Sequence, residues 1–253
     1  MIITIINQKG GVAKTTSAAN LSAALAMMHR KVLCIDLDPQ GNLSTSLGIE
    51  HSQRKNNIYE VLVDMCTISQ SISGTFNSNL DCISANIDLS AFQVEFAHSN
   101  KKELILKNQL SDIDNQYDYI IIDSPPSLGL LAINALVASQ QIIIPMQCEF
   151  LSLEGLSYLM QTVKIIQTSY NKDLNILGIL LTMYDKRNRI SEIVANDIIS
   201  CLGDITFDTI IPRNVKVAEA PSHGRPVVVY DNRSPGAIAY TNLAKEIDAK
   251  FRR

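Results

Sequence analysis

The sequence of 253 residues contains no tryptophan and only five cysteines, which are scattered and form no C-x-x-C pair. This cysteine pattern excludes a disulfide scaffold and a metal ribbon, and it favours a reducing cytoplasm. No apolar run approaches the roughly 18 residues that a membrane span needs. With 11 glycines and 8 prolines, the chain is too poor in both for a collagen-like or low-complexity protein. We therefore expect a globular protein of the cytoplasm.

The sequence also lacks an excess of basic residues, because its net charge is −3. This balance argues against a protein that coats nucleic acid with its whole surface. The charge is uneven, however. Residues 1–126 carry 9 Lys and Arg against 13 Asp and Glu, whereas residues 127–253 carry 13 against 12. A local basic face in the second half is compatible with these counts.

Apolar runs of strand length alternate with helical patterns along the chain. Strands are expected at 2–6, 31–37, 80–84, 117–122, 141–145, 176–183 and 207–211. Helices are expected at 17–28, 87–112, 128–138, 152–169, 190–202 and 235–252, while 67–79 and 222–234 are rich in loops. Continuous apolar strands are typical of burial on both faces, and strand–helix alternation is typical of a parallel sheet. We predict one α/β domain over residues 1–253, with a mostly parallel, twisted sheet and helices on both faces.

A glycine-rich loop follows the first strand and runs directly into a helix. It comprises Lys9, Gly10, Gly11, Val12, Ala13, Lys14, Thr15 and Thr16. A glycine-rich loop at a helix N-terminus aims backbone N–H groups and the helix dipole at an anion. Lys14 is placed to reach the β and γ phosphates of a nucleotide, and the Thr15 hydroxyl to bind Mg²⁺. The ordinary G-x-x-x-x-G-K-[ST] pattern does not fit, whereas the deviant K-G-G-x-x-K-[ST] pattern, with Lys9 as its extra lysine, does.

Three aspartates stand where predicted strands end. Asp36 and Asp38 lie on one face of their strand, since side chains alternate with a period of two. Asp123 closes an apolar strand in the manner of a Walker B acid, which places it to hold a water of Mg²⁺. Strands often end in aspartate because it favours turns, so Asp123 alone is a weak signal. Three carboxylates near a phosphate loop, at the edge where open parallel sheets bind ligands, predict a nucleotide-hydrolysing P-loop NTPase.

Five segments together resemble the ParA/Soj family of chromosome-partitioning ATPases, which carry the deviant Walker A loop. They are KGGVAKTT from Lys9, DLDPQGN from Asp36, IIIDSPPSLG from Ile120, QCEFLSLEG from Gln147 and IPRNVKVAEAPSHG from Ile211. The resemblance runs from Ile2 to about Lys250, and the ordered set is far more specific than any one segment. Ala13 departs from the glycine that is frequent at its position, and we expect little effect from it.

The resemblance implies an ATPase that uses ATP and Mg²⁺ and forms an ATP-dependent sandwich homodimer. Lys9 would reach the nucleotide bound by the partner subunit, and Glu149 would contact the ribose of that nucleotide. Pro212, Arg213 and Asn214 occupy the segment on the adenine side. Because each subunit would lend a lysine to the other, dimerisation and catalysis would be coupled.

The resemblance also assigns the chemical step. Asp38 would orient or activate the attacking water and, with Lys9 and Lys14, make up the catalytic group. Asp36 and Asp123, together with Thr15, would support Mg²⁺ and the moving loops. Phosphoryl transfer needs this combination of neutralised phosphate charge and an in-line water.

DNA and a second protein are further partners that the resemblance implies. The ATP-bound dimer would bind double-stranded DNA without sequence preference, and a centromere-binding protein of the ParB/Spo0J kind would stimulate hydrolysis and release. Lys186, Arg187 and Arg189 form a basic loop, and Lys216 lies farther along the chain. Arg187 and Lys216 match positions where the family binds DNA, although a solvated charged face is the ordinary explanation for such a cluster. The protein is then expected in the cytoplasm, associated with the nucleoid.

A membrane-associated cell-division ATPase of the MinD kind is the main alternative. Such proteins share the nucleotide site but end in an amphipathic helix that binds membranes. Leu243, Ile247 and Phe251 form an apolar stripe near the C-terminus, but Glu246 and Asp248 interrupt its cationic face. A narrow stripe of this kind favours a helix packed on the core over a membrane helix.

Two further relatives fit the residues less well. An iron–sulfur reductase needs cysteines arranged symmetrically at a dimer interface, but residues 124–131 contain none and Cys148 lacks a second partner. A plasmid-type relative that represses its own operon has an N-terminal helix-turn-helix domain, and we expect none here because the first strand starts at Ile2. A non-enzymatic binding module is hard to reconcile with three carboxylates and two loop lysines.

Overall fold

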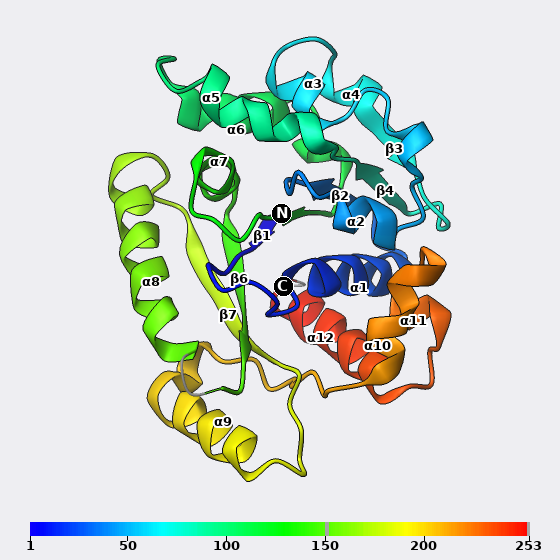
Figure 1. Ribbon diagram of the computed structural model, residues 1–253, viewed down its shortest axis with the longest axis vertical. Helices are drawn as coiled ribbons and strands as arrows, with labels where there is room; N and C mark the ends of the chain where they lie inside the picture. Colours follow the sequence, from blue (N-terminus) through cyan, green and yellow to red (C-terminus); the bar gives the residue numbers. More distant parts are fainter. Residues whose placement is uncertain (150–151, 252–253) are drawn as a thin grey trace.

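A seven-stranded β-sheet forms the centre of the protein in a computed structural model that describes residues 1–149 and 152–251 (Figure 1). The strands are β1 (Ile2–Ile5), β2 (Val32–Asp36), β3 (Ile72–Gly74), β4 (Leu80–Ile83), β5 (Tyr119–Asp123), β6 (Gln141–Gln147) and β7 (Asn175–Thr182). Their order across the sheet is β3-β4-β2-β5-β1-β6-β7, and only the β3–β4 pair is antiparallel. The predicted α/β fold with a mostly parallel sheet is confirmed.

Helices cover both faces of this sheet (Figure 1). The α-helices are α1 (Lys14–Met27), α2 (Asn42–Ser46), α3 (Ile58–Leu62), α4 (Ile68–Ser71), α5 (Phe92–Glu95), α6 (Ile105–Leu110), α7 (Leu130–Ala138), α8 (Ser152–Ser169), α9 (Arg189–Leu202), α10 (Val215–Glu219), α11 (Val227–Tyr230) and α12 (Pro235–Phe251). The 3-10 helices are η1 (His51–Gln53), η2 (Ile87–Ala91), η3 (Lys102–Leu104), η4 (Asp114–Gln116), η5 (Gly203–Ile205) and η6 (Ala220–His223).

The hydrophobic core lies on both sides of the sheet because neighbouring strand residues point to opposite faces. On β2, Cys34 packs into the cluster that includes α1 and α12, whereas Leu33 and Ile35 pack into the cluster that includes α6 and α7. All five residues of β2 and of β5 are buried. This two-sided burial explains why these strands read as continuous apolar runs in the sequence.

The strand predicted at 207–211 is wrong. This segment lies beside β7 without forming a ladder: Thr206 makes an isolated bridge with Ile179 of β7, and Pro212 makes one with Tyr184, just after β7. Between them, the backbone N–H groups of Asp208 and Thr209 donate to the Glu246 carboxylate of α12, at 3.0 and 3.1 Å, instead of to a neighbouring strand. The seventh strand is instead β3, which falls in the stretch 67–79 that was expected to be loop. With three residues at the edge of the sheet, β3 is too short to show the apolar pattern of a strand in the sequence.

The helix predicted at 87–112 is also wrong as a single element. The chain there forms η2, α5, η3 and α6 in turn. The break coincides with His98-Ser99-Asn100, which are turn-favouring residues, and Lys101 then takes a left-handed conformation with φ 57°. A local preference for turns therefore outweighs the helical apolar spacing.

The last helix, α12, packs on the core as predicted. Leu243 and Ile247 are fully buried in the cluster that contains α1, and Phe251 is half-buried against it. The Asp248 carboxylate accepts two hydrogen bonds from Arg30, at 2.8 and 3.0 Å, and one from Tyr119 at 3.0 Å. Residue 252, the predicted end of this helix, lies outside the described residues. Among the residues that the structure describes, no helix combines the length and the hydropathy of a membrane span.

Candidate functional site

The glycine-rich loop after β1 wraps around the N-terminus of α1. Gly11 and Ala13 both take left-handed conformations, with φ 73° and 68°. Glycine adopts this conformation freely, but in alanine the Cβ crowds the neighbouring carbonyl oxygen, at a cost of about 1 kcal/mol. Ala13 is thus a strained position, and the backbone explains why glycine is frequent there. The sequence alone did not reveal this strain.

Lys14, the first residue of α1, is enclosed by the loop and is only 7% exposed. Its ammonium donates a hydrogen bond of 3.2 Å to the Lys9 carbonyl oxygen. Burial lowers the pKa of Lys14, and the nearby Asp123 and Asp38 carboxylates oppose that shift. A buried cation between a loop and carboxylates is poised to take up a polyanion.

The neighbouring strands hold the loop in place. The Asn7 side chain donates to the Pro145 carbonyl oxygen at 2.7 Å, and the Gln147 side chain donates to that of Gly11 at 3.1 Å. The Thr182 hydroxyl, at the end of β7, lies 3.2 Å from the Val12 carbonyl oxygen. The loop therefore rests on the ends of β6 and β7, which gives it a defined shape before any ligand binds.

A cavity of about 310 Å³ opens in front of the loop, and this is the candidate phosphate site. Its lining comprises Gly10, Gly11, Ala13, Lys14, Thr15, Thr16, Asp38, Asn42, Pro126 and Met183. The structure thus brings together the predicted loop residues and one predicted carboxylate, Asp38. Asn42, Pro126 and Met183 also line the cavity and were not predicted as site residues, although Asn42 lies in the DLDPQGN motif and Pro126 in the IIIDSPPSLG motif.

The three predicted aspartates have different surroundings. Asp38 lines the cavity, and its carboxylate accepts one hydrogen bond, of 3.0 Å, from the Gln40 backbone. Asp36 is fully buried and accepts hydrogen bonds from the Ser44 backbone and hydroxyl, at 2.8 and 2.7 Å. Burial raises the pKa of Asp36 to about 6, while the hydrogen bonds from Ser44 act against this. Asp36 therefore anchors α2, whose first residue lines the cavity.

Asp123 lies opposite Asp36 in the register of β5 and β2, and it is fully buried. Within the described part of the chain, neither of its carboxylate oxygens has a hydrogen-bond partner. Burial, followed by the charge of Asp36, raises its pKa well above the ordinary value, while the Thr15 hydroxyl and the Lys14 ammonium act in the opposite direction. A buried carboxylate without partners costs free energy unless something completes its hydrogen bonds.

A hydrated Mg²⁺ fits these surroundings. Thr15 and Asp123 lie together beside the phosphate cavity, and the coordinated waters of Mg²⁺ can donate to the unpartnered Asp123 oxygens. No cluster of three or more His, Cys, Asp or Glu side chains placed for a metal occurs in residues 1–149 and 152–251. Mg²⁺ keeps several waters and uses few protein ligands together with phosphate oxygens.

Lys9 and Glu149, which were both expected to act on the other subunit's nucleotide, contact each other in the single chain. The Lys9 ammonium lies 2.8 Å from a Glu149 carboxylate oxygen, and both side chains are partly exposed. Neither residue lines the phosphate cavity. Of the Gln147–Gly155 motif, residues 150 and 151 lie outside the described residues.

The predicted adenine-side residues lie next to the cavity rather than in it. The Arg213 backbone donates to the Tyr184 carbonyl oxygen at 2.9 Å, which holds this segment beside the end of β7. Arg213 lines a second hollow of about 540 Å³ together with Glu149 and Met183, and Met183 also lines the phosphate cavity. Asn214 caps α10 by accepting a hydrogen bond from the Val217 backbone. Pro212 lines a third hollow, on the side of α12.

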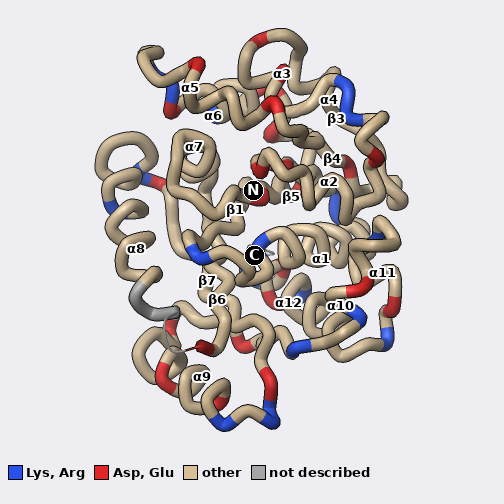
Figure 2. Tube along the Cα trace, in the orientation of Figure 1, with Lys and Arg blue, Asp and Glu red and all other residues tan. Residues whose placement is uncertain are grey.

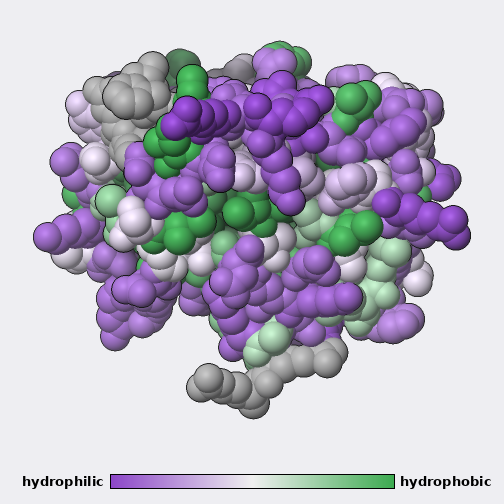
Figure 3. Space-filling model, turned by 90° about the horizontal axis from the view of Figure 1, so that it is seen from below, coloured by the Kyte–Doolittle hydropathy of each residue, from purple (hydrophilic) through white to green (hydrophobic). Residues whose placement is uncertain are grey.

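The four predicted DNA-binding residues lie around the start of α9 and on α10, where Figure 2 shows lysine and arginine. Arg187 is 88% exposed but is paired with Asp185, and Lys216 is paired with Glu219. Lys186 and Arg189 make no ion pair among the described residues. The loop 184–187 borders a groove of about 830 Å³ whose apolar lining includes Ile210 and Ile238. The underside in Figure 3 likewise shows hydrophobic side chains among predominantly hydrophilic ones.

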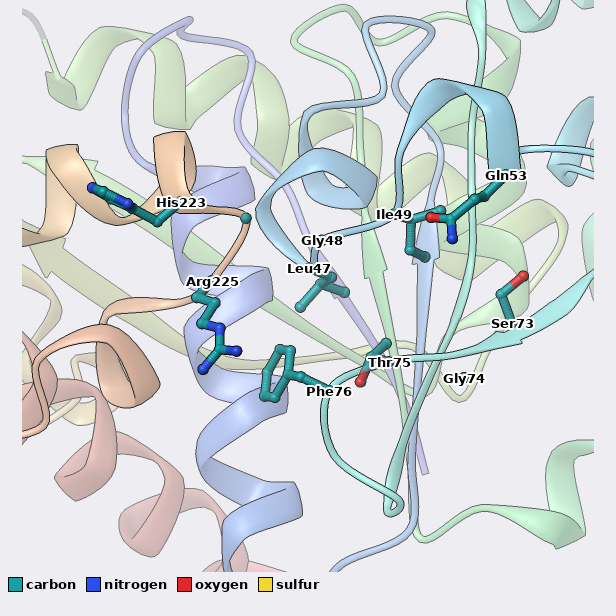
Figure 4. A pocket seen from close by; sticks show the side chains of 11 residues that line it. Leu47, Gly48, Ile49, Gln53, Ser73, Gly74, Thr75, Phe76, His223 and Arg225 are labelled. Atoms are coloured by element: carbon teal, nitrogen blue, oxygen red, sulfur yellow. The ribbon is translucent and has the colours of Figure 1, made fainter.

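A separate hollow of about 410 Å³ lies between the end of α2, β3 and η6 (Figure 4). Its lining includes Ile49, Phe76 and Arg225, and in Figure 4 the Arg225 side chain extends toward Phe76. None of the predicted site residues lines it. The chemistry of a nucleotide site is therefore concentrated at the loop after β1.

Comparison with known proteins identifies the family. The AAA domain family matches residues 1–176. The sporulation initiation inhibitor protein Soj of Bacillus subtilis is 48% identical over 248 residues, which cover 98% of this chain and 98% of that protein. The chromosome partitioning protein ParA of Caulobacter vibrioides is 45% identical over 253 residues, covering 99% of this chain and 95% of that protein. The chain belongs to the ParA/Soj family of chromosome-partitioning ATPases.

A solved structure shares the fold of this ParA/Soj chain. The crystal structure of cobyrinic acid a,c-diamide synthase from Mycobacterium smegmatis, with bound ADP and magnesium, matches it with a TM-score of 0.85 and 35% identity, covering 100% of this chain and 96% of that chain. Membership of the ParA/Soj family confirms the predictions of ATPase activity and of ATP and Mg²⁺ as cofactors.

Proposed function

We propose that this chain is a DNA-segregation ATPase that works as an ATP-bound sandwich dimer. The dimer binds double-stranded DNA of the nucleoid without sequence preference, and a centromere-binding protein of the ParB kind stimulates hydrolysis and releases it. The observation that carries the proposal is the position of Lys9 and Gly10. Lys9 stands outside the phosphate cavity of its own chain, and a side chain added at Gly10 would meet open space.

The proposed roles in hydrolysis follow from the surroundings of each side chain. Lys14 neutralises phosphate charge, because its ammonium is enclosed by the loop. Asp38 positions the attacking water, because it is the one aspartate of the three that lines the cavity. Thr15 and Asp123 hold Mg²⁺ and its waters, and Asp36 supports α2. When bound, Mg²⁺ neutralises charge on the β and γ phosphates.

The proposed dimer requires Lys9 and Glu149 to exchange partners. In the single chain they neutralise each other at 2.8 Å. In the sandwich, Lys9 would turn to the phosphates and Glu149 to the ribose of the other subunit's nucleotide. An exposed ion pair is worth at most about 1 kcal/mol, so a nucleotide with several negative charges is able to displace it. The second lysine then reaches the phosphates only when two subunits meet.

Gly10→Val tests the dimer. An added Cβ at Gly10 would meet no atom within 4 Å in the chain itself, so the variant is expected to fold normally. A branched side chain there would separate two facing loops, and we expect a protein that binds ATP but remains monomeric by light scattering. Gly10→Ala should show an intermediate loss of dimer. A normal ATP-dependent dimer in the valine variant would show that the loop faces solvent instead.

Arg187→Glu and Lys216→Glu test DNA binding. Each is expected to reduce ATP-dependent binding to duplex DNA at least tenfold, equally for natural and scrambled sequences, since phosphate contacts carry no sequence information. Lys107→Glu on α6 is the matched control, because it makes the same charge change at an exposed position at the opposite end of the molecule from α9 (Figure 1). The measurement is a mobility shift with ATP at two salt concentrations. Full binding by the double variant would place the DNA surface elsewhere.

The membrane-associated alternative is weakened by the packing of α12. The apolar stripe that would enter a membrane is occupied, because Leu243 and Ile247 are buried against α1. Pelleting with liposomes of anionic lipid, with and without ATP, separates the two functions. ATP-dependent pelleting without any DNA binding would favour the cell-division kind of ATPase.

A further inference from the structure

The Arg187 side chain is 88% exposed, yet its guanidinium is already engaged. It donates two hydrogen bonds to Asp185, one to each carboxylate oxygen, both at 3.0 Å. The Arg187 backbone N–H donates to the same carboxylate, also at 3.0 Å. The Asn188 backbone closes the turn by donating to the Asp185 carbonyl oxygen. Asp185 thus shapes this loop and neutralises its exposed cation.

Lys216, on α10, has an equivalent carboxylate. Its ammonium lies 2.9 Å from one oxygen of Glu219, and the Tyr230 hydroxyl donates to the other oxygen at 2.7 Å. The Lys216 ammonium also lies 5.6 Å from the centroid of the Tyr230 ring. Glu219 therefore holds the lysine in one orientation, against an aromatic ring, and cancels its charge.

Both carboxylates are ionised at physiological pH. Hydrogen bonds from Arg187 lower the pKa of Asp185 to about 2, and hydrogen bonds from Lys216 and Tyr230 lower that of Glu219. The other two cations of the predicted DNA surface, Lys186 and Arg189, have no such partner among the described residues. Hence Arg187 and Lys216, the two positions that the family resemblance implies for DNA contact, are the two whose side chains are paired with a carboxylate.

We propose that Asp185 and Glu219 limit the affinity for DNA, because each holds a DNA-contacting cation that phosphate can take only by displacing a carboxylate. This inference rests on the proposed DNA-binding function. A cation already paired with an acid releases fewer counterions when it meets a phosphate, so it adds less to affinity and to its salt dependence. The two carboxylates therefore keep the affinity for DNA low, which suits a protein that must dissociate from DNA after hydrolysis.

Asp185→Asn and Glu219→Gln test this directly. Both variants keep the shape of the side chain and an acceptor oxygen for the turn or for Tyr230, but they remove the charge. With ATP, each variant is expected to bind duplex DNA about two- to fivefold more tightly at low salt, since exposed ion pairs are weak. The log–log slope of affinity against salt should become steeper by up to about 0.9 for each cation freed in the dimer.

Two controls separate a local effect from a change in net charge or structure. Glu95→Gln on α5 makes the same charge change at a carboxylate that accepts from Tyr59, away from the basic loop, and should alter DNA affinity little. Asp185→Asn combined with Arg187→Glu should show no gain, because Asp185 acts through Arg187. ATP-dependent dimerisation is measured for each variant by light scattering, so that the compared proteins are dimers.

The outcomes distinguish this inference from the function on which it rests. If wild type binds DNA and Arg187→Glu does not, but both amide variants bind no better than wild type, the acids do not limit affinity. Weaker binding by the amide variants would show that the acids orient the cations for DNA instead, and would overturn the inference. If neither wild type nor any variant binds DNA, the proposed function fails and the inference falls with it.

Discussion

Lys14→Ala is expected to abolish both ATP binding and hydrolysis while the protein stays folded. Lys14 is the one lysine enclosed by the phosphate loop, and the carboxylates of Asp38 and Asp123 lie near its ammonium. Without it, the triphosphate would meet these two carboxylates with no lysine to offset their charge. A loss of affinity of at least a hundredfold follows, to be measured by titration calorimetry with Mg²⁺-ATP.

Lys9→Ala is the matched comparison for Lys14→Ala. Lys9 belongs to the same loop but points away from the cavity, toward Glu149. We expect this variant to bind ATP as a monomer and to fail in dimerisation and hydrolysis. Circular dichroism checks the fold of both variants. Unchanged ATP affinity in a folded Lys14→Ala protein would refute the assignment of the phosphate loop.

Asp38→Ala is expected to leave ATP bound and to slow hydrolysis by about 10²–10⁴-fold, which is the usual effect of losing a group that positions or activates water. Among the residues that the structure describes, the Asp38 side chain accepts a hydrogen bond only from the Gln40 backbone, so its removal disturbs little else. The proposed consequence is a dimer that remains on DNA. Single-turnover hydrolysis and DNA retention after ATP wash-out measure the two effects.

Asp36→Ala provides the contrast to Asp38→Ala. Asp36 accepts from the Ser44 backbone and hydroxyl, so its loss is expected to release α2 and to lower the thermal midpoint of unfolding.

Normal hydrolysis in a folded Asp38→Ala variant would mean that another residue positions the water. Asn42, at the start of α2 in the cavity lining, is the next candidate.

Much of the candidate site could be predicted because its residues are close in sequence. The loop, Lys14 and the aspartates occur in short motifs whose spacing is fixed by the ends of a strand and the start of a helix. The pairing of Lys9 with Glu149 could not be predicted, because the two residues are 140 positions apart and meet only through the sheet. The strain at Ala13 depends on a backbone angle that a sequence does not show.

Most of the fold could also be predicted from local sequence patterns. The prediction failed where contacts between distant residues decide the structure. Six of the seven strands were predicted, because most of them are apolar runs and burial on both faces leaves that signature in the sequence. The segment 207–211 has the same signature, but Glu246 takes two of its backbone N–H groups, so no ladder forms. Asp185 and Glu219 lie within three positions of Arg187 and Lys216. Their ion pairs with these cations were still not predicted, because the sequence shows the charges but not how the side chains are oriented.

The central place of β1 has a consequence for the synthesis of the protein. β1 and its loop are the first residues to leave the ribosome, but β1 pairs with β5 and β6, and Thr182 contacts Val12 from 170 positions away. This isoleucine-rich strand therefore waits, unpaired, until the segment that forms β5 and β6 has been made. During that time it exposes an aggregation-prone edge. The first segment translated thus gains its native neighbours only after residues far along the chain, up to Thr182, have been made.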